Sequence, residues 1–72
     1  MIEVVTMREI EAVFAVTDAL GISREAVVIP LSPEHPGRVR RLPGGKLEIV
    51  VDAEVPIDEW VKGLPAMIHA AR

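Results

Sequence analysis

The sequence predicts a single α+β domain: a two-layer α-β-β-β-α sandwich in which two helices cover one face of a small antiparallel meander of three strands. Apolar residues recur with helical spacing near both ends of the chain, and the middle contains short β-rich runs separated by Pro and Gly. Helices that flank such strands pack on one face of the sheet. A chain of 72 residues, residues 1–72, is expected to form one domain.

The first helix is expected to run from about Met7 to Leu20. Thr6 and Glu9 have the spacing of a capping box, and Gly21 suits the left-handed conformation that ends a helix. One apolar face of this helix consists of Ile10, Val13, Phe14, Thr17 and Leu20. A second face of small residues consists of Ala12, Ala15, Val16 and Ala19.

The first strand is expected over Ala26–Leu31, which is rich in β-branched residues. Pro30 cannot donate a ladder hydrogen bond, so this strand should lie at a sheet edge. Two further strands, 38–42 and 46–53, are joined by Pro43-Gly44-Gly45.

The register of this hairpin can be predicted from its side chains. A two-residue loop would place Arg38 and Arg40 on the apolar face, whereas a three-residue loop sets Val39 opposite Ile49 and Arg40 opposite Glu48. The second register keeps the core apolar and pairs opposite charges, so we expect the three-residue loop.

The second helix is expected to begin near Pro56, which suits a first helical position. Gly63 and Pro65 predict a kink or a break near Leu64. Its inner stripe consists of Ile57, Trp60, Val61, Leu64, Ile68 and Ala71.

Composition restricts the function classes. The chain has no Cys, which excludes disulfides and thiol chemistry, and its net charge of −3 argues against nonspecific nucleic-acid binding. No apolar run is long enough to span a membrane, and the N-terminus lacks signal-peptide features, so we expect a cytoplasmic protein. The absence of Asn and Gln, together with six Arg against two Lys, suggests a thermophilic source.

The segment Leu20–Val27 resembles the turn of helix-turn-helix DNA-binding proteins through its Leu-Gly-Ile-Ser core and the later Val. That resemblance would imply a DNA-reading helix after the turn. Pro30 falls where this helix needs a packing Leu, and Arg24 is its only basic donor. We therefore expect a helix that ends at Gly21 and a connection into a strand.

Residues 38–69 resemble the layout of zincin metallopeptidases, in which a strand and a turn lead to a helix bearing His-Glu-x-x-His. His69 could represent the first His, but Ala70 occupies the place of the general base, and no second His follows. His35 is expected to be a solvated loop residue and His69 to lie beside the inner stripe of the second helix, although a joint site of the two histidines with an acid stays open. Ser23 and Ser32 fit capping and turn roles. We expect no catalytic residue, metal site or cofactor.

Four positive charges without an acid lie in the hairpin, at Arg38, Arg40, Arg41 and Lys46, and five acids without a base follow from Glu48 to Glu59. The arginines could form an anion- or nucleic-acid-binding platform, or they could be ion-pair partners of acids in the sheet or across a subunit interface. The predicted register places Arg38 and Arg40 outward and Arg41 on the core side. For this reason the platform is the alternative function.

The leading prediction is a non-enzymatic, homo-oligomeric interaction module that binds a protein partner or serves as a subunit of a larger assembly. An enzyme whose site forms only at a subunit interface is the remaining alternative. Half of the residues are hydrophobic, and a small domain cannot bury so much apolar surface alone. The small-residue face of the first helix, Ala12, Ala15, Val16 and Ala19, is the expected interface, because small side chains permit close helix–helix approach.

Overall fold

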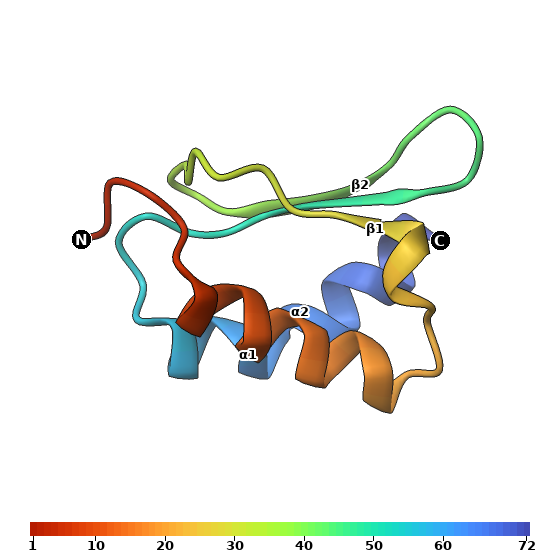
Figure 1. Ribbon diagram of the computed structural model, residues 1–72, viewed down its shortest axis with the longest axis horizontal. Coiled ribbons are helices and arrows are strands. Elements are labelled where there is room, and N and C mark those ends of the chain that lie inside the picture. The colour runs from red at the N-terminus through yellow and green to blue at the C-terminus, as the bar shows by residue number, and fades with distance from the viewer.

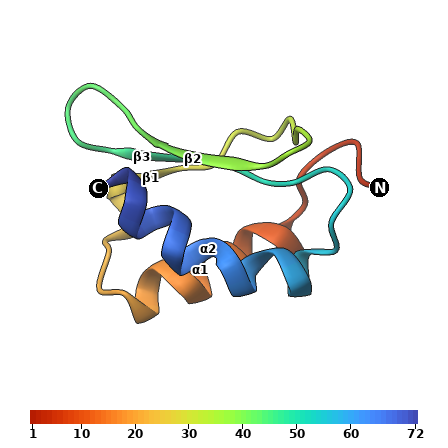
Figure 2. The ribbon, with the colours of Figure 1, turned by 180° about the vertical axis from the view of Figure 1, so that it is seen from behind.

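A computed structural model describes residues 1–72 as two layers, with a three-stranded sheet on one side and two helices on the other (Figure 1). In chain order the elements are α1 (Met7–Ala19), the one-turn 3-10 helix η1 (Arg24–Ala26), β1 (Val27–Val28), β2 (Arg38–Arg41), β3 (Leu47–Val50) and α2 (Ile57–Ala71). Seen from behind, both helices still lie on one side of the sheet (Figure 2). The predicted α+β fold class is confirmed.

The N-terminus of α1 carries the predicted capping box. The Glu9 carboxylate accepts hydrogen bonds from the Thr6 backbone N–H at 2.8 Å and from the Thr6 hydroxyl at 2.6 Å. These bonds satisfy groups that a helix start leaves without partners and lower the pKa of Glu9. After Leu20 the chain turns at Gly21, where φ is +75°.

The sheet has the order β1-β3-β2, with β2 antiparallel and β1 parallel to β3. The predicted antiparallel meander is therefore wrong for β1. The reason is that the hairpin commits one edge of β3 to β2, and the segment 29–37 carries the chain past the end of β3 to the far side. β1 thus pairs with the remaining edge of β3, the strand with the most buried residues. β1 is also shorter than predicted, ending before Pro30.

The hairpin has the predicted register, with Val39 opposite Ile49 and Arg40 opposite Glu48. The Leu42 N–H donates to the Lys46 carbonyl at 2.7 Å and closes the three-residue loop. Gly44 and Gly45 both have positive φ, +94° and +92°, which glycine adopts without strain.

Helix α2 continues through Gly63 and Pro65, so the predicted break near Leu64 is wrong, while the kink that was the other expectation stays a prediction. Pro65 is exposed, whereas Trp60, Leu64 and Ile68 are buried. The packing of this apolar stripe outweighs the hydrogen bond that Pro65 cannot donate, because tertiary burial contributes more than local propensity.

The core lies between the helices and the inner face of the sheet. It contains Val13 from α1, Ile49 from β3, and Leu64 and Ile68 from α2, each no more than 1% exposed. Gly37 lies against this core from the sheet side. A Cβ there would lie 2.8 Å from Trp60 Cζ2 and 2.7 Å from the Asp52 backbone nitrogen, so only glycine fits. No helix is long and apolar enough to cross a membrane.

Candidate functional site

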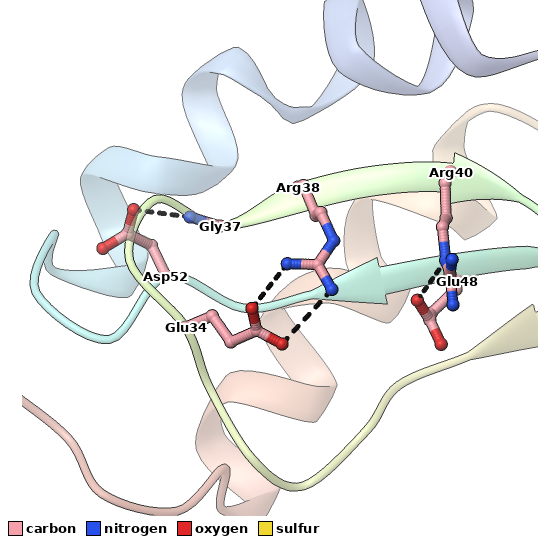
Figure 3. Close-up of polar contacts among 6 residues, drawn as sticks. All are labelled: Glu34, Gly37, Arg38, Arg40, Glu48 and Asp52. Carbon is pink, nitrogen blue, oxygen red and sulfur yellow. Dashed lines mark hydrogen bonds and ion pairs between the residues drawn. The ribbon is translucent and has the colours of Figure 1, made fainter.

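The three arginines proposed as an anion platform do not point to one place. Arg38 and Arg40 alternate with Val39 along β2 and project from the outer face of the sheet, away from the helices (Figure 3). Arg41 pairs with Leu47, a core residue, and so belongs to the inner side at the end of the strand. The structure therefore brings Arg38 and Arg40 together and separates Arg41 from them.

Both outward arginines are engaged by carboxylates. The Arg38 guanidinium donates to both oxygens of Glu34, at 2.6 and 3.2 Å, and Arg40 Nε donates to Glu48 at 2.7 Å (Figure 3). The hydrogen bonds between Arg38 and Glu34 raise the pKa of Arg38 and lower the pKa of Glu34. An incoming anion would have to displace these carboxylates, so the outer face is a poor anion platform.

The residue opposite Arg38 in the register is apolar and buried. Val50 lies opposite Arg38 in the register, on the face away from the helices, yet it is only 1% exposed. Arginine stems commonly lie over apolar side chains with their charged heads in water. We infer that Arg38 shields Val50 and that its role on this face is structural.

Asp52 is a buried carboxylate whose role sequence reasoning missed. Just after β3, the backbone of Glu34 pairs with the chain on both sides of Asp52, through Val51 and Ala53. This pairing brings the loop before β2 against Asp52, whose Oδ2 accepts from the Gly37 N–H at 2.9 Å (Figure 3). A short polar residue that ends a strand and begins a turn is the sequence signal that could have indicated this role.

The other oxygen of Asp52 organises the turn toward α2. Its Oδ1 accepts from the backbone N–H groups of Glu54 at 2.8 Å and Val55 at 2.9 Å, and lies 3.1 Å from His35 Nδ1. Burial by itself would raise the pKa of Asp52, but the three backbone donors and His35 outweigh it and hold the pKa well below its ordinary value. Asp52 is thus an anionic clamp that joins two loops.

His35 contacts the buried Asp52, whereas His69 does not join them, so the joint site of two histidines and an acid does not form. The hydrogen bond that His35 forms with Asp52 raises the pKa of His35, although burial opposes this shift. The imidazole remains about half exposed. A His–Asp pair activates a nucleophile only when a hydroxyl or thiol contacts the free ring nitrogen. No hydrogen bond joins His35 to such a group, so the pair ties the loop rather than forming a triad.

The remaining histidine and the helix-turn-helix segment carry no site geometry. His69 is exposed on α2, and nowhere do three His, Cys, Asp or Glu side chains gather where they could hold a metal ion. Residues 24–28 form η1 and β1, so no recognition helix follows Gly21. Ser23 accepts the Glu25 N–H at 3.3 Å, as expected of a capping residue.

Large exposed apolar side chains gather at one end of the molecule, which we call the apolar end. Backbone hydrogen bonds of 2.8 Å join Ile2 to Ala53 and Val5 to Leu31, and thereby bring three segments together beside the start of α1 (Figure 1). This end comprises five of the six large apolar side chains that are exposed: Met1, Val4, Met7, Leu31 and Val55.

The small-residue face of α1 is divided by the packing. Ala12 and Val16 are partly buried against the chain's own core, while Ala15 and Ala19 are exposed. The buried face of α1 instead centres on Glu9, Val13 and Thr17. An interface through Ala15 and Ala19 stays a prediction, but the four residues do not form one free surface.

No protein family, curated protein or solved structure matches this chain.

Proposed function

We propose that this protein is a non-enzymatic assembly module that associates with a second copy of itself through the apolar end. The observation that carries the proposal is that the exposed side chains of Met1, Val4, Met7, Leu31 and Val55 belong to segments that backbone hydrogen bonds bring together at one end of the molecule. Contiguous apolar patches on small proteins commonly mark interaction sites. We place this module in the cytoplasm of a thermophile, in keeping with its lack of Cys, Asn and Gln.

A second copy is the occupant that suits this surface. In a two-fold contact the same patch lies on both sides, so an apolar patch matches itself without new charges. A stable interface covers about 800 Å² per partner, which is a modest part of the 4487 Å² that this chain exposes. At the rim, Arg8 and Asp58 lie 3.4 Å apart and are both largely exposed, so two copies could exchange these partners across the axis.

Met7→Glu tests this proposal. Met7 is the first residue of α1, where an acid interacts favourably with the helix N-terminus, so the substitution should leave the monomer folded. In a dimer it would bury a charge in an apolar contact. We expect sedimentation velocity at micromolar concentrations to give a dimer for the unmodified chain and a monomer for Met7→Glu.

Ala15→Glu is the matched control, since Ala15 is exposed two turns further along the same helix. It should leave the dimer intact, and circular dichroism should show native helix content for both variants. Dissociation by Ala15→Glu but not by Met7→Glu would instead locate the interface on the small-residue face. A monomeric unmodified chain would refute self-association altogether.

A further inference from the structure

The largest cavity of the molecule is lined by residues of η1 and the turn before it, the hairpin and the end of α2. These segments lie at the end of the molecule opposite the apolar end (Figure 1). Its volume of about 420 Å³ is within the usual range for small-molecule sites. Its lining includes two arginines and no acidic residue, and consists of Gly21, Ile22, Ser23, Ala26, Arg41, Gly45, Leu47 and Arg72.

The arginines of this cavity differ from all the others in the chain. Each of the other four arginines forms an ion pair with a carboxylate: Arg8, Arg24, Arg38 and Arg40. Arg41 and Arg72 are the two arginines that form none, and both line the same cavity. Lys46, beside the hairpin loop, also lacks an ion pair. The basic side chains that lack a carboxylate side-chain partner, Arg41, Lys46 and Arg72, therefore lie at or beside this end.

The other lining groups suit an organic anion rather than a bare ion. Ile22 and Leu47 are buried core residues, so they give the cavity an apolar floor. Ser23 accepts the Glu25 N–H through its oxygen, which leaves the hydroxyl proton free to donate. Glu25 and Glu48 are sequence neighbours of lining residues, but neither lines the cavity.

The two guanidinium groups must supply most of the electrostatic attraction for an anion in this cavity. The cavity adjoins the C-terminal end of α2, where main-chain carbonyls carry partial negative charge that repels anions. Guanidinium groups bind phosphate oxygens bidentately, and two of them balance a dianionic head group. We propose that this cavity binds a small organic phosphate, with the phosphate between Arg41 and Arg72 and a compact apolar body on Ile22 and Leu47.

Phenyl phosphate is a suitable probe, and Arg41→Ala with Arg40→Ala is the matched pair of variants. Arg40 and Arg41 are neighbours on β2, but Arg40 projects from the outer face of the sheet, away from the cavity. By calorimetry we expect Arg41→Ala to weaken phenyl phosphate binding about tenfold or more, and Arg40→Ala to leave it almost unchanged. Arg72→Ala should behave like Arg41→Ala, which guards against a folding defect in one variant.

Nuclear magnetic resonance can locate the bound probe independently. We expect phenyl phosphate to shift the amide signals of Ser23 and Gly45, and inorganic phosphate and benzoate to bind more weakly, the first for lack of the apolar body and the second for lack of a dianionic head. No binding by the unmodified chain, equal losses in the Arg40 and Arg41 variants, or shifts confined to the outer face would overturn the site. Equal binding of phenyl phosphate and inorganic phosphate would overturn the role of the apolar floor. Benzoate binding as tightly as phenyl phosphate would overturn the phosphate assignment.

Discussion

Replacing Asp52 with Asn should destabilise the fold strongly while preserving the shape of the side chain. Asp52 is only 4% exposed, and its two oxygens accept three backbone N–H groups. An Asn oxygen can still serve Glu54 and Val55, but the Asn NH₂ group would then face the Gly37 N–H, donor against donor. The variant also loses the charge that strengthens the remaining bonds.

The expected loss can be estimated from these contacts. A hydrogen bond to a charged group contributes about 1.5–3 kcal/mol, and a buried donor left without an acceptor costs a similar amount. We expect Asp52→Asn to lower the free energy of unfolding by about 3 kcal/mol, which corresponds to a fall in Tm of about 12–24 °C for a domain of this size. Thermal and urea unfolding followed by circular dichroism measure both quantities.

The pH dependence of stability gives a second test of the role of Asp52. The pKa of Asp52 is depressed below its ordinary value of 3.8 in the folded state, so its contribution is complete above that value and is lost as the pH falls toward the folded-state pKa. The unmodified chain should therefore lose stability on acidification below about pH 4, and Asp52→Asn should lose less. Asp58→Asn is the control, because Asp58 is exposed and lies 3.4 Å from Arg8. Equal stability of the two variants would refute the anionic clamp.

Three other substitutions test the fold and the outer face. Gly37→Ala should cost about 2 kcal/mol or more in unfolding free energy, because its Cβ has no room beside Trp60; a variant as stable as the unmodified chain would show that this contact is loose. Glu9→Ala should cost about 1 kcal/mol through loss of the capping box, measured by urea unfolding, and an unchanged midpoint would contradict that role. Replacing Arg38 and Arg40 together by Ala should leave any weak binding of an RNA oligonucleotide unchanged, because Glu34 and Glu48 already occupy these arginines; a clear loss in a filter-binding assay would restore the anion platform.

Local sequence signals were sufficient to predict the features that depend only on residues close together in the chain. The capping box at Thr6 and Glu9 depends on residues three apart. The hairpin register follows from strict side-chain alternation, because a slip of one residue would turn Arg40 toward the core. The same alternation separates Arg41 from Arg38 and Arg40. The sequence therefore already indicated that the three arginines do not share one face, although it did not reveal the ion pairs that engage Arg38 and Arg40.

Features that depend on where distant segments meet were not available from the sequence. Whether β1 joins β3 parallel or antiparallel depends on the path of the segment between β1 and β2, which has no repeating pattern. The burial of Asp52 depends on the loop at Gly37 folding back onto the end of β3.

The cavity shows most clearly which features the sequence predicts and which only the tertiary structure determines. Alternation along β2 predicts that Arg41 faces inward, but its partner Arg72 is 31 positions away in the chain. Only the continuity of α2 through Pro65 brings the end of that helix to the hairpin loop, and a break there would have directed Arg72 elsewhere. Local propensity argued for that break, and packing of Trp60, Leu64 and Ile68 against the sheet overrode it, because burial of an apolar stripe outweighs one missing hydrogen bond.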